Sequence, residues 1–134
     1  MPLDIFEEYA TDAVKEVEGA EVPLGADTVL VIARGGNKNF NREILAENEA
    51  NEVKFKMLPP EQVEALDTEI ICRVMAKTIL LGWKNLNYKG TALKYSQKNA
   101  EMLLRHNDFR AKVLQLANNI AFFKSKIEEA AVKN

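Results

Sequence analysis

The sequence predicts a mainly α-helical fold with a small antiparallel β-hairpin, built as a single compact domain of about five helices. The length of 134 residues suits one domain with a modest core. Most apolar residues recur three and four positions apart, which is the spacing of one face of an α-helix. One segment is instead rich in β-branched residues and is bounded by glycine turns, which is typical of a hairpin.

The first helix is expected from Ile5 to Val17. Its apolar residues fall in two adjacent rows on one helical face, and its charged residues lie largely on the other. Asp4 is placed to cap the start of this helix, and Gly19 is placed to end it. The pattern therefore predicts a helix whose apolar face packs against the rest of the domain.

The hairpin follows directly, with strands at residues 20–24 and 28–33 and a turn at 25–27. Because a lone hairpin is marginal in water, it must pack on a helix or pair with another chain. The next residues, 34–39, contain a glycine pair of the kind that can cradle a phosphate. They lack the glycine spacing and the Lys-Ser/Thr pair of a phosphate loop, so we interpret them as a turn from strand to helix.

Three more helices are expected in the middle of the chain. A thin apolar side predicts the first at residues 41–56, and the Pro-Pro pair that ends it opens a longer helix at 60–81. Residues 83–95 form an ordered loop, in which a glycine is available for a positive-φ turn. Ser96 then caps a short helix over residues 97–104.

The last helix is expected to begin after a cap at Asp108 and to carry the most regular apolar pattern of the chain. Its apolar residues are spaced alternately four and three apart, which is the repeat of a helix that packs along another helix. The flanks of this repeat are mostly basic and favour an acidic partner helix. A core helix packed within the chain is the simpler interpretation, and a helix of another protein is the alternative. The residues of the repeat are Phe109, Val113, Leu116, Ile120, Phe123, Ile127 and Ala130.

Charge is divided unequally between the two halves of the chain. Residues 1–67 hold six Lys and Arg against fifteen Asp and Glu, a net of −9, and residues 68–134 hold twelve against five, a net of +7. Such a chain can bind itself head to tail, fold its halves onto each other, or use its basic half on an acidic partner. The residues expected to carry self-association are Glu7, Glu8 and Asp12 on the acidic side and Lys84, Lys89, Lys94 and Lys98 on the basic side.

Little in the sequence indicates catalysis, and we expect neither an enzyme nor a cofactor. His106 is the only histidine, and no nucleophile motif or neighbouring cysteine accompanies it. One histidine and the single cysteine, Cys72, are too few ligands for a metal site. The longest apolar run, residues 29–33, is too short to cross a bilayer, and the acidic start of the chain differs from a secretory signal. The expected location is therefore the cytoplasm, without membrane attachment.

A small nucleic-acid-binding protein is the alternative function. Between Arg73 and Lys112 lie nine basic residues and only two acidic ones, with four aromatic residues interspersed. Basic groups bind phosphates and aromatic rings stack on bases. No recognised nucleic-acid motif is present, and the acidic half would repel a polyanion.

Two stretches of the chain carry a family resemblance. One is Gly82-Trp83-Lys84-Asn85-Leu86 followed by Gly90, Tyr95-Ser96, Ala100 and Leu103-Leu104, and the other is the strand at 29–33 running into residues 34–41. Both are similar to segments of the tail assembly chaperones of long-tailed, non-contractile phages, which are of the lambdoid, siphovirus type. The two stretches cover about half of the chain, and we expect residues 1–134 to form a single tail-assembly-chaperone-like domain.

The resemblance implies a small protein that binds the long helical tape measure protein and keeps it soluble until the tail tube polymerises around it. It further implies self-association around the tape measure, the tail tube protein as a candidate partner, the cytoplasm of the infected bacterium, and absence from the mature virion. An extended helical client with exposed apolar stripes would aggregate unless another protein bound those stripes. Oppositely charged ends of the chaperone permit head-to-tail assembly. The expected contacts with the partner are Trp83, Leu86 and Tyr95 in the loop, together with whichever of Phe109, Leu116, Ile120 and Phe123 is exposed.

Overall fold

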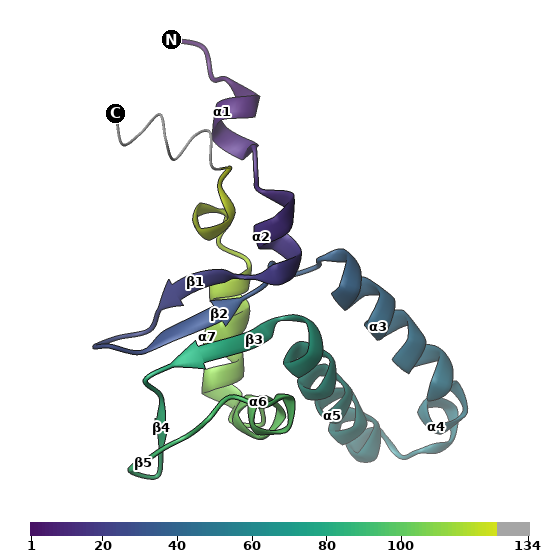
Figure 1. The fold of residues 1–134 in the computed structure, drawn as a ribbon. Helices are drawn as coiled ribbons and strands as arrows, with labels where there is room; N and C mark the ends of the chain where they lie inside the picture. The colour runs from purple at the N-terminus through teal and green to yellow at the C-terminus, as the bar shows by residue number, and fades with distance from the viewer. Residues whose placement is uncertain (126–134) are drawn as a thin grey trace.

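The structure, a computed structural model, describes residues 1–125 of the chain. It is mainly α-helical, as predicted, with two small antiparallel sheets where one hairpin was expected, and these residues form seven α-helices rather than about five (Figure 1). The elements are α1 (Ile5–Tyr9), α2 (Ala13–Glu18), β1 (Ala20–Pro23), β2 (Val29–Ile32), α3 (Lys38–Ala50), α4 (Glu52–Met57), α5 (Pro60–Thr78), β3 (Leu80–Lys84), β4 (Asn87–Tyr88), β5 (Thr91–Ala92), α6 (Gln97–Leu104), α7 (Asn107–Ala117) and the 3₁₀ helix η1 (Ile120–Phe123).

The predicted hairpin is confirmed, and it gains a third strand. Strand β2 pairs antiparallel with β1 and also with β3, so that Leu30 lies opposite Trp83. The expected helix to residue 81 is therefore wrong at its end, because the chain leaves α5 at Ile79 and continues as a strand. Ile79 and Leu80 are both fully buried, and a short apolar run of this kind fits a buried helix end and a buried strand equally well.

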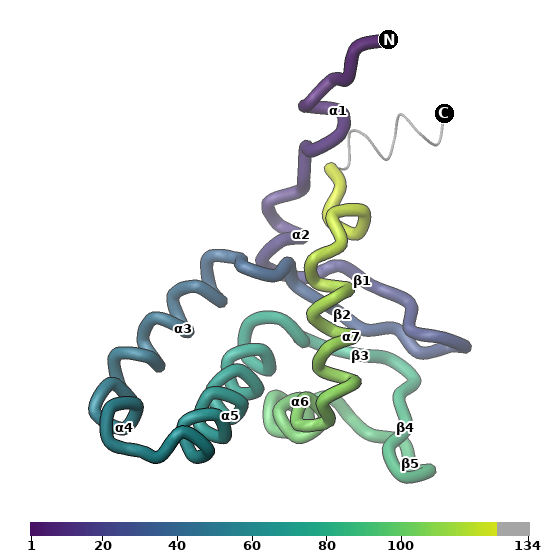
Figure 2. Tube along the Cα trace, turned by 180° about the vertical axis from the view of Figure 1, so that it is seen from behind, coloured from purple at the N-terminus to yellow at the C-terminus, as the bar shows by residue number. Residues whose placement is uncertain are grey.

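The core lies between the three-stranded sheet and helices α5, α6 and α7. Figure 2 shows α7 crossing the sheet. Helix α6 lies at the lower end of α7, and α5 lies beside α6. The sheet contributes Leu30 and Ile32, and the helices contribute Met75, Leu104 and Val113, all with no more than a trace of exposed surface. Helix α3 packs along α5 at the edge of this core, outside the sheet (Figure 1).

The turn between β2 and α3 confirms the interpretation of residues 34–39. The side-chain oxygen of Asn37 accepts hydrogen bonds from the backbone N–H groups of Asn39 and Phe40 and so caps α3. Its amide nitrogen donates to the carbonyl oxygens of Arg34 at 2.8 Å and Thr78 at 3.1 Å. The turn thereby joins the start of α3 to the end of α5.

The single helix expected from Ile5 to Val17 is two short helices. Asp12 caps α2 by accepting hydrogen bonds from the backbone N–H groups of Val14 and Lys15, and this local bond competes with a continuous helix. Thr11 forms a β-bridge with Lys124 at the same place. Neither helix buries a residue, and α1 projects away from the rest of the molecule (Figure 1). The end of the predicted helix is correct, since Gly19 terminates α2 with a φ of 99°.

The helix expected at 41–56 is also divided. It begins earlier, at the Asn37 cap, and breaks at Asn51, whose side chain donates to the carbonyl oxygen of Glu47 at 2.7 Å. Helix α4 continues from there at a new angle (Figure 1). The long helix begins at Pro60 as predicted, and α6 begins after Ser96, which accepts a hydrogen bond from the backbone N–H of Asn99.

The last helix is much shorter than predicted. Helix α7 starts before Asp108, with His106 at the cap position, and ends at Ala117. Asn119 then accepts a hydrogen bond from the backbone N–H of Ala121 and caps η1, which is the kind of local bond that stops a helix. The seven-residue repeat therefore does not form one rod over the described residues, and its last two members, at positions 127 and 130, lie outside them.

Candidate partner-binding surfaces

Trp83 and Tyr95 fix the loop between β3 and α6 to the sheet. The Trp83 side chain is 9% exposed, and its indole N–H donates to the carbonyl oxygen of Leu93 at 2.7 Å. The two rings meet edge to face, and the Tyr95 hydroxyl donates to the carbonyl oxygen of Leu80 at 2.8 Å. Burial raises the pKa of Tyr95. These two predicted contact residues therefore have an internal structural role, and Trp83 offers little surface to a partner.

The predicted loop contains a second hairpin, which sequence reasoning missed. Strands β4 and β5 are joined by Lys89 and Gly90, both with positive φ, at 53° and 80°. Two successive positive-φ residues make the tight turn that suits a two-residue hairpin. Tyr88 ties this hairpin to the junction of α6 and α7, because its hydroxyl lies 2.9 Å from Nε2 of His106.

An open hollow of ≈ 600 Å³ lies between this hairpin and the turn that joins β1 to β2. Its two sides are held together by Thr28, whose hydroxyl donates to the carbonyl oxygen of Asn85 at 2.7 Å. We refer to it as the hairpin hollow. It is lined by Ala26, Asp27, Thr28, Asn85, Leu86, Asn87, Ala92, Leu93 and Lys94. The structure thus places Leu86, a predicted partner contact, and Lys94, a predicted self-association residue, in one site.

The four predicted basic residues are all exposed, but not all are equally available. Lys84 forms an ion pair with Glu21 at 2.7 Å. The ammonium group of Lys89 lies 5.6 Å from the centre of the Tyr88 ring, which is within the range of a cation–π contact. Residues 70–100 contain no Asp or Glu, so the acidic groups beside the hairpin come from another segment: Asp27 lines the hollow, and Glu21 pairs with Lys84.

The predicted acidic residues lie at the other end of the molecule. Glu7 and Glu8 are exposed on α1, and their backbone carbonyl oxygens accept hydrogen bonds from the Lys124 ammonium group. The Asp12 carboxylate caps α2. Glu7 and Glu8 therefore present charge to solvent, whereas Asp12 has a structural role.

The expected seam of the last helix is mostly core. Leu116 is 9% exposed and Phe123 is fully buried, while Phe109 and Ile120 are half-buried. For the residues that the structure describes, the interpretation as a core element is the correct one. Only Phe109 and Ile120 of the four candidates keep surface that a partner can reach.

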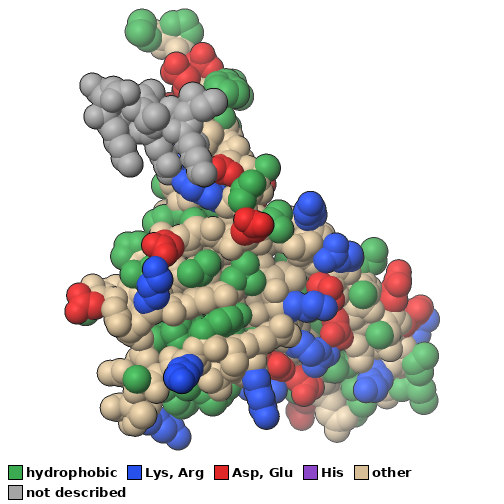
Figure 3. All heavy atoms as spheres, viewed as in Figure 1, with side chains coloured by type: hydrophobic (Ala, Val, Ile, Leu, Met, Phe, Trp, Pro, Cys, Tyr) green, Lys and Arg blue, Asp and Glu red, His purple; other side chains and the backbone are tan. Residues whose placement is uncertain are grey.

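The large apolar side chains that are exposed lie elsewhere, in two helical segments that sequence reasoning did not select. Ile5, Phe6 and Tyr9 on α1 are 59–70% exposed, as is Leu3 before it at 63%, and Val14 on α2 is 60% exposed. The second group, which we call the α3–α4 surface, consists of Leu45, Val53 and Met57, at 61–78%. Figure 3 shows hydrophobic side chains over both regions. The sequence pattern identified the apolar face of the first segment but did not show that this face is exposed.

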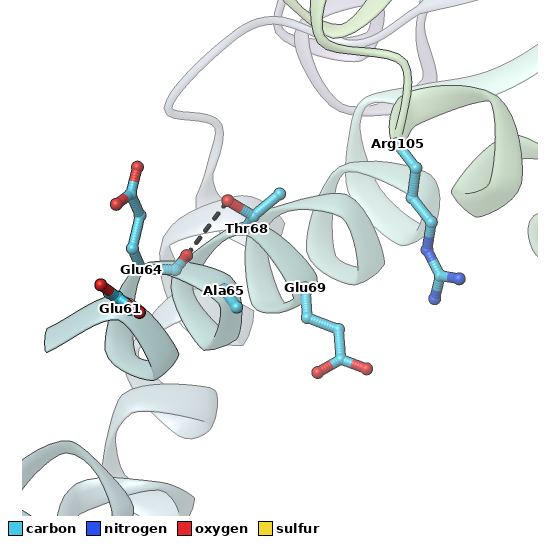
Figure 4. A pocket seen from close by; sticks show the side chains of 6 residues that line it. All are labelled: Glu61, Glu64, Ala65, Thr68, Glu69 and Arg105. Carbon is cyan, nitrogen blue, oxygen red and sulfur yellow. Dashed lines mark hydrogen bonds between the residues drawn. The ribbon is translucent and has the colours of Figure 1, made fainter. Parts of the chain in front are cut away.

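A further groove of ≈ 440 Å³ runs along α5 next to the end of α6. Three carboxylates and Arg105 border it, but Figure 4 shows that the side chains of Glu61, Glu64 and Glu69 do not converge on a common point. Over residues 1–125, no group of three or more His, Cys, Asp or Glu side chains is placed to hold a metal ion. We assign no chemistry to this groove.

Residues 33–134 match the family model of the YdaY prophage protein. The chain belongs to the YdaY prophage protein family. It is therefore a phage-derived protein. The part of this YdaY family protein that matches includes the α3–α4 surface and most of the lining of the hairpin hollow. Neither the comparison with curated proteins nor that with solved structures finds a match. Within residues 1–125, the YdaY family protein has no helix of the length and apolar character needed to span a membrane.

Proposed function

We propose that this YdaY family protein is a phage tail assembly chaperone that binds the tape measure protein, keeps it soluble before the tail tube polymerises, and self-associates head to tail. One observation carries the proposal. Within residues 1–125, the exposed large apolar side chains all belong to the first 14 residues or to α3 and α4. Several exposed large apolar side chains on neighbouring helices are typical of sites of protein interaction, whereas single exposed apolar residues are ordinary.

The α3–α4 surface is the proposed site for the tape measure protein. Helix α3 is held to α5 by ion pairs from Glu47 to Arg73 at 2.8 Å and from Glu43 to Lys77 at 2.9 Å. Because these carboxylates face α5, the outer side of α3, which carries Leu45, is kept toward solvent. A rigid helical surface with exposed aliphatic side chains suits the apolar stripe of an extended helical client.

The location follows from the proposal. A protein with this task acts in the cytoplasm of the infected bacterium and leaves before the virion is complete, and the tail tube protein is a further candidate partner. No catalytic step is part of this function, and it needs no cofactor.

The alternative, nucleic-acid binding through the basic segment, is less well supported by the geometry. Stacking on bases needs accessible ring faces, and the Trp83 ring is buried against Tyr95. Lys84, the basic residue next to it, is paired with Glu21. These contacts leave the segment with fewer free groups than its composition indicates.

Coexpression tests the proposed function. The protein would be produced together with the product of a long helical reading frame adjacent to its gene, and the soluble fraction of that product would be measured. The double variant Val53→Glu/Met57→Glu should leave the tape measure protein insoluble, because it places charge on the α3–α4 surface. Lys54→Glu is the matched control, since it makes the same change in net charge on α4 without removing apolar surface. Full solubilisation by the double variant would contradict the proposal.

A further inference from the structure

We propose that the N-terminal arm of one copy, residues 1–9, docks into the hairpin hollow of a second copy. This inference rests on the proposed function, because it specifies the contact through which the chaperone self-associates. It commits the arm to another molecule of the same chain and leaves the α3–α4 surface to the tape measure protein.

Among the described residues, the arm buries no side chain against its own molecule, and its contacts with the rest of the chain include hydrogen bonds from the Lys124 ammonium group to the backbone carbonyl oxygens of Glu7 and Glu8. All of residues 1–9 are exposed, and α1 has five residues, none of them buried. Isolated helices shorter than about 12 residues are marginal in water. A helix of this length therefore gains most of its stability from packing against another surface. Ile5, Phe6 and Tyr9 lie on this helix and together offer a compact apolar surface for such a contact.

The hairpin hollow has the size and lining to receive that surface. Its volume of ≈ 600 Å³ is in the range that encloses several side chains. Leu86, Ala92 and Leu93 supply apolar lining. The walls are fixed before docking by the Trp83–Tyr95 pair and by the Thr28–Asn85 hydrogen bond, which lowers the entropic cost of binding.

The two surfaces are complementary in charge. Asp4, Glu7 and Glu8 lie on the arm, and residues 1–14 contain no Lys or Arg. Lys94 lines the hollow, and Lys89 stands on the adjoining hairpin turn. Two acidic residues belong to the facing β1–β2 segment: Asp27 lines the hollow, and Glu21 is paired with Lys84. Since residues 70–100 add no other acid, the hairpin side of the hollow attracts an acidic helix and repels a basic one.

The arrangement of the fold makes this contact intermolecular and open-ended. In Figures 1 and 2 the arm projects from one end of the molecule, and the β4–β5 hairpin forms part of the opposite end. Within the described residues, each copy therefore presents an exposed arm at one end and an open hollow near the other. A contact between two different patches propagates from copy to copy and gives a chain or a spiral rather than a closed dimer.

A charge-exchange experiment tests the inference. Sedimentation velocity would be measured on the intact protein and on two variants, Glu7→Lys/Glu8→Lys in the arm and Lys89→Glu/Lys94→Glu at the hollow. The wild-type protein should form species larger than the 15.1 kDa chain, and their mass should rise with concentration. Each variant alone should sediment as a monomer, because its arm and its hollow carry like charge. An equimolar mixture should recover large species, since every arm then finds a hollow of opposite charge.

The mixture separates a specific contact from a general loss of structure, because misfolded variants would not restore each other. A wild-type protein that stays monomeric, a variant that assembles alone, or a mixture that stays monomeric would each overturn the inference. Coexpression with the tape measure protein distinguishes the two proposals. If the assembly results fail while Val53→Glu/Met57→Glu still abolishes solubilisation, the arm contact is wrong and the chaperone function stands.

Discussion

The indole of Trp83 and the phenol ring of Tyr95 meet edge to face, with their centroids 4.9 Å apart and an interplanar angle of 81°. Their polar atoms bond to the carbonyl oxygens of Leu93 and Leu80. The pair thereby ties the loop that carries the β4–β5 hairpin to the central sheet. These two residues, which were predicted as partner contacts, thus hold the loop that lines the hollow.

Truncation of this pair should destabilise the protein. Tyr95→Phe removes the hydrogen bond to the Leu80 carbonyl and should cost about 1 kcal/mol of unfolding free energy. Trp83→Ala removes a buried ring and should cost about 3–5 kcal/mol. Urea denaturation followed by circular dichroism measures both. Unchanged stability of Trp83→Ala would show that its ring does not fix the loop.

Phe123 and Phe6 form a matched comparison of a buried and an exposed phenylalanine. Phe123 is fully buried and Phe6 is 70% exposed. Phe123→Ala should lower the unfolding free energy by about 3–5 kcal/mol, because it leaves a cavity in the core. Phe6→Ala should change it by no more than about 0.5 kcal/mol. Thermal or urea unfolding of the monomeric protein at low concentration measures the difference, and equal effects would contradict the assigned burial.

The ion pair between α3 and α5 makes stability depend on pH. A hydrogen bond from Arg73 and its positive charge lower the pKa of Glu47 from its usual value of 4.5. The folded state therefore favours the ionised carboxylate, and this contribution is present above the unfolded pKa and is lost as the pH falls through the folded pKa. Unfolding free energies measured from pH 6 down to pH 3 should decline less steeply for Glu47→Gln than for the wild type. Glu16 has a lowered pKa as well, from the Thr11 hydroxyl and from Arg34, so some decline should remain in the variant.

Gly90 should resist substitution for a conformational reason. Its φ of 80° lies in the left-handed region, and a Cβ at this position would meet nothing within 4 Å. The cost of Gly90→Ala is therefore backbone strain rather than a clash, and it should be about 1–2 kcal/mol. Gly25, which also has positive φ and open space, provides a second position for the same measurement of thermal unfolding. A Gly90→Ala variant as stable as the wild type would contradict the turn.

Elements with a local chemical signal were predictable from the sequence. The hairpin at β1 and β2 follows from β-branched residues around a glycine turn, and Asp4, Ser96 and Pro60 mark helix starts that the structure confirms. These signals act over a few residues and do not depend on the tertiary environment. The third strand was not predictable in the same way. Leu80 is fully buried, and a buried leucine fits the end of a helix as well as it fits a strand.

The sequence could not decide which of the candidate apolar residues are exposed. Periodicity identifies an apolar face, but whether another element covers that face is decided by the tertiary fold. The faces that include Ile5 on α1 and Phe123 near the end of the described chain were assigned by the same argument. In the described residues Ile5 is 62% exposed and Phe123 is fully buried, and caps at Asp12 and Asn119 start new helices beside them.

Hydrogen exchange of the α3–α4 amides tests the central claim most directly. The measurement would compare the protein alone with the complex that copurifies with the tape measure protein, using mass spectrometry of the peptides that contain Leu45, Val53 and Met57. The account predicts slower exchange in these peptides in the complex, with little change in the core strand β2. Exchange in α3 and α4 that is the same in the complex as in the free protein would contradict the account.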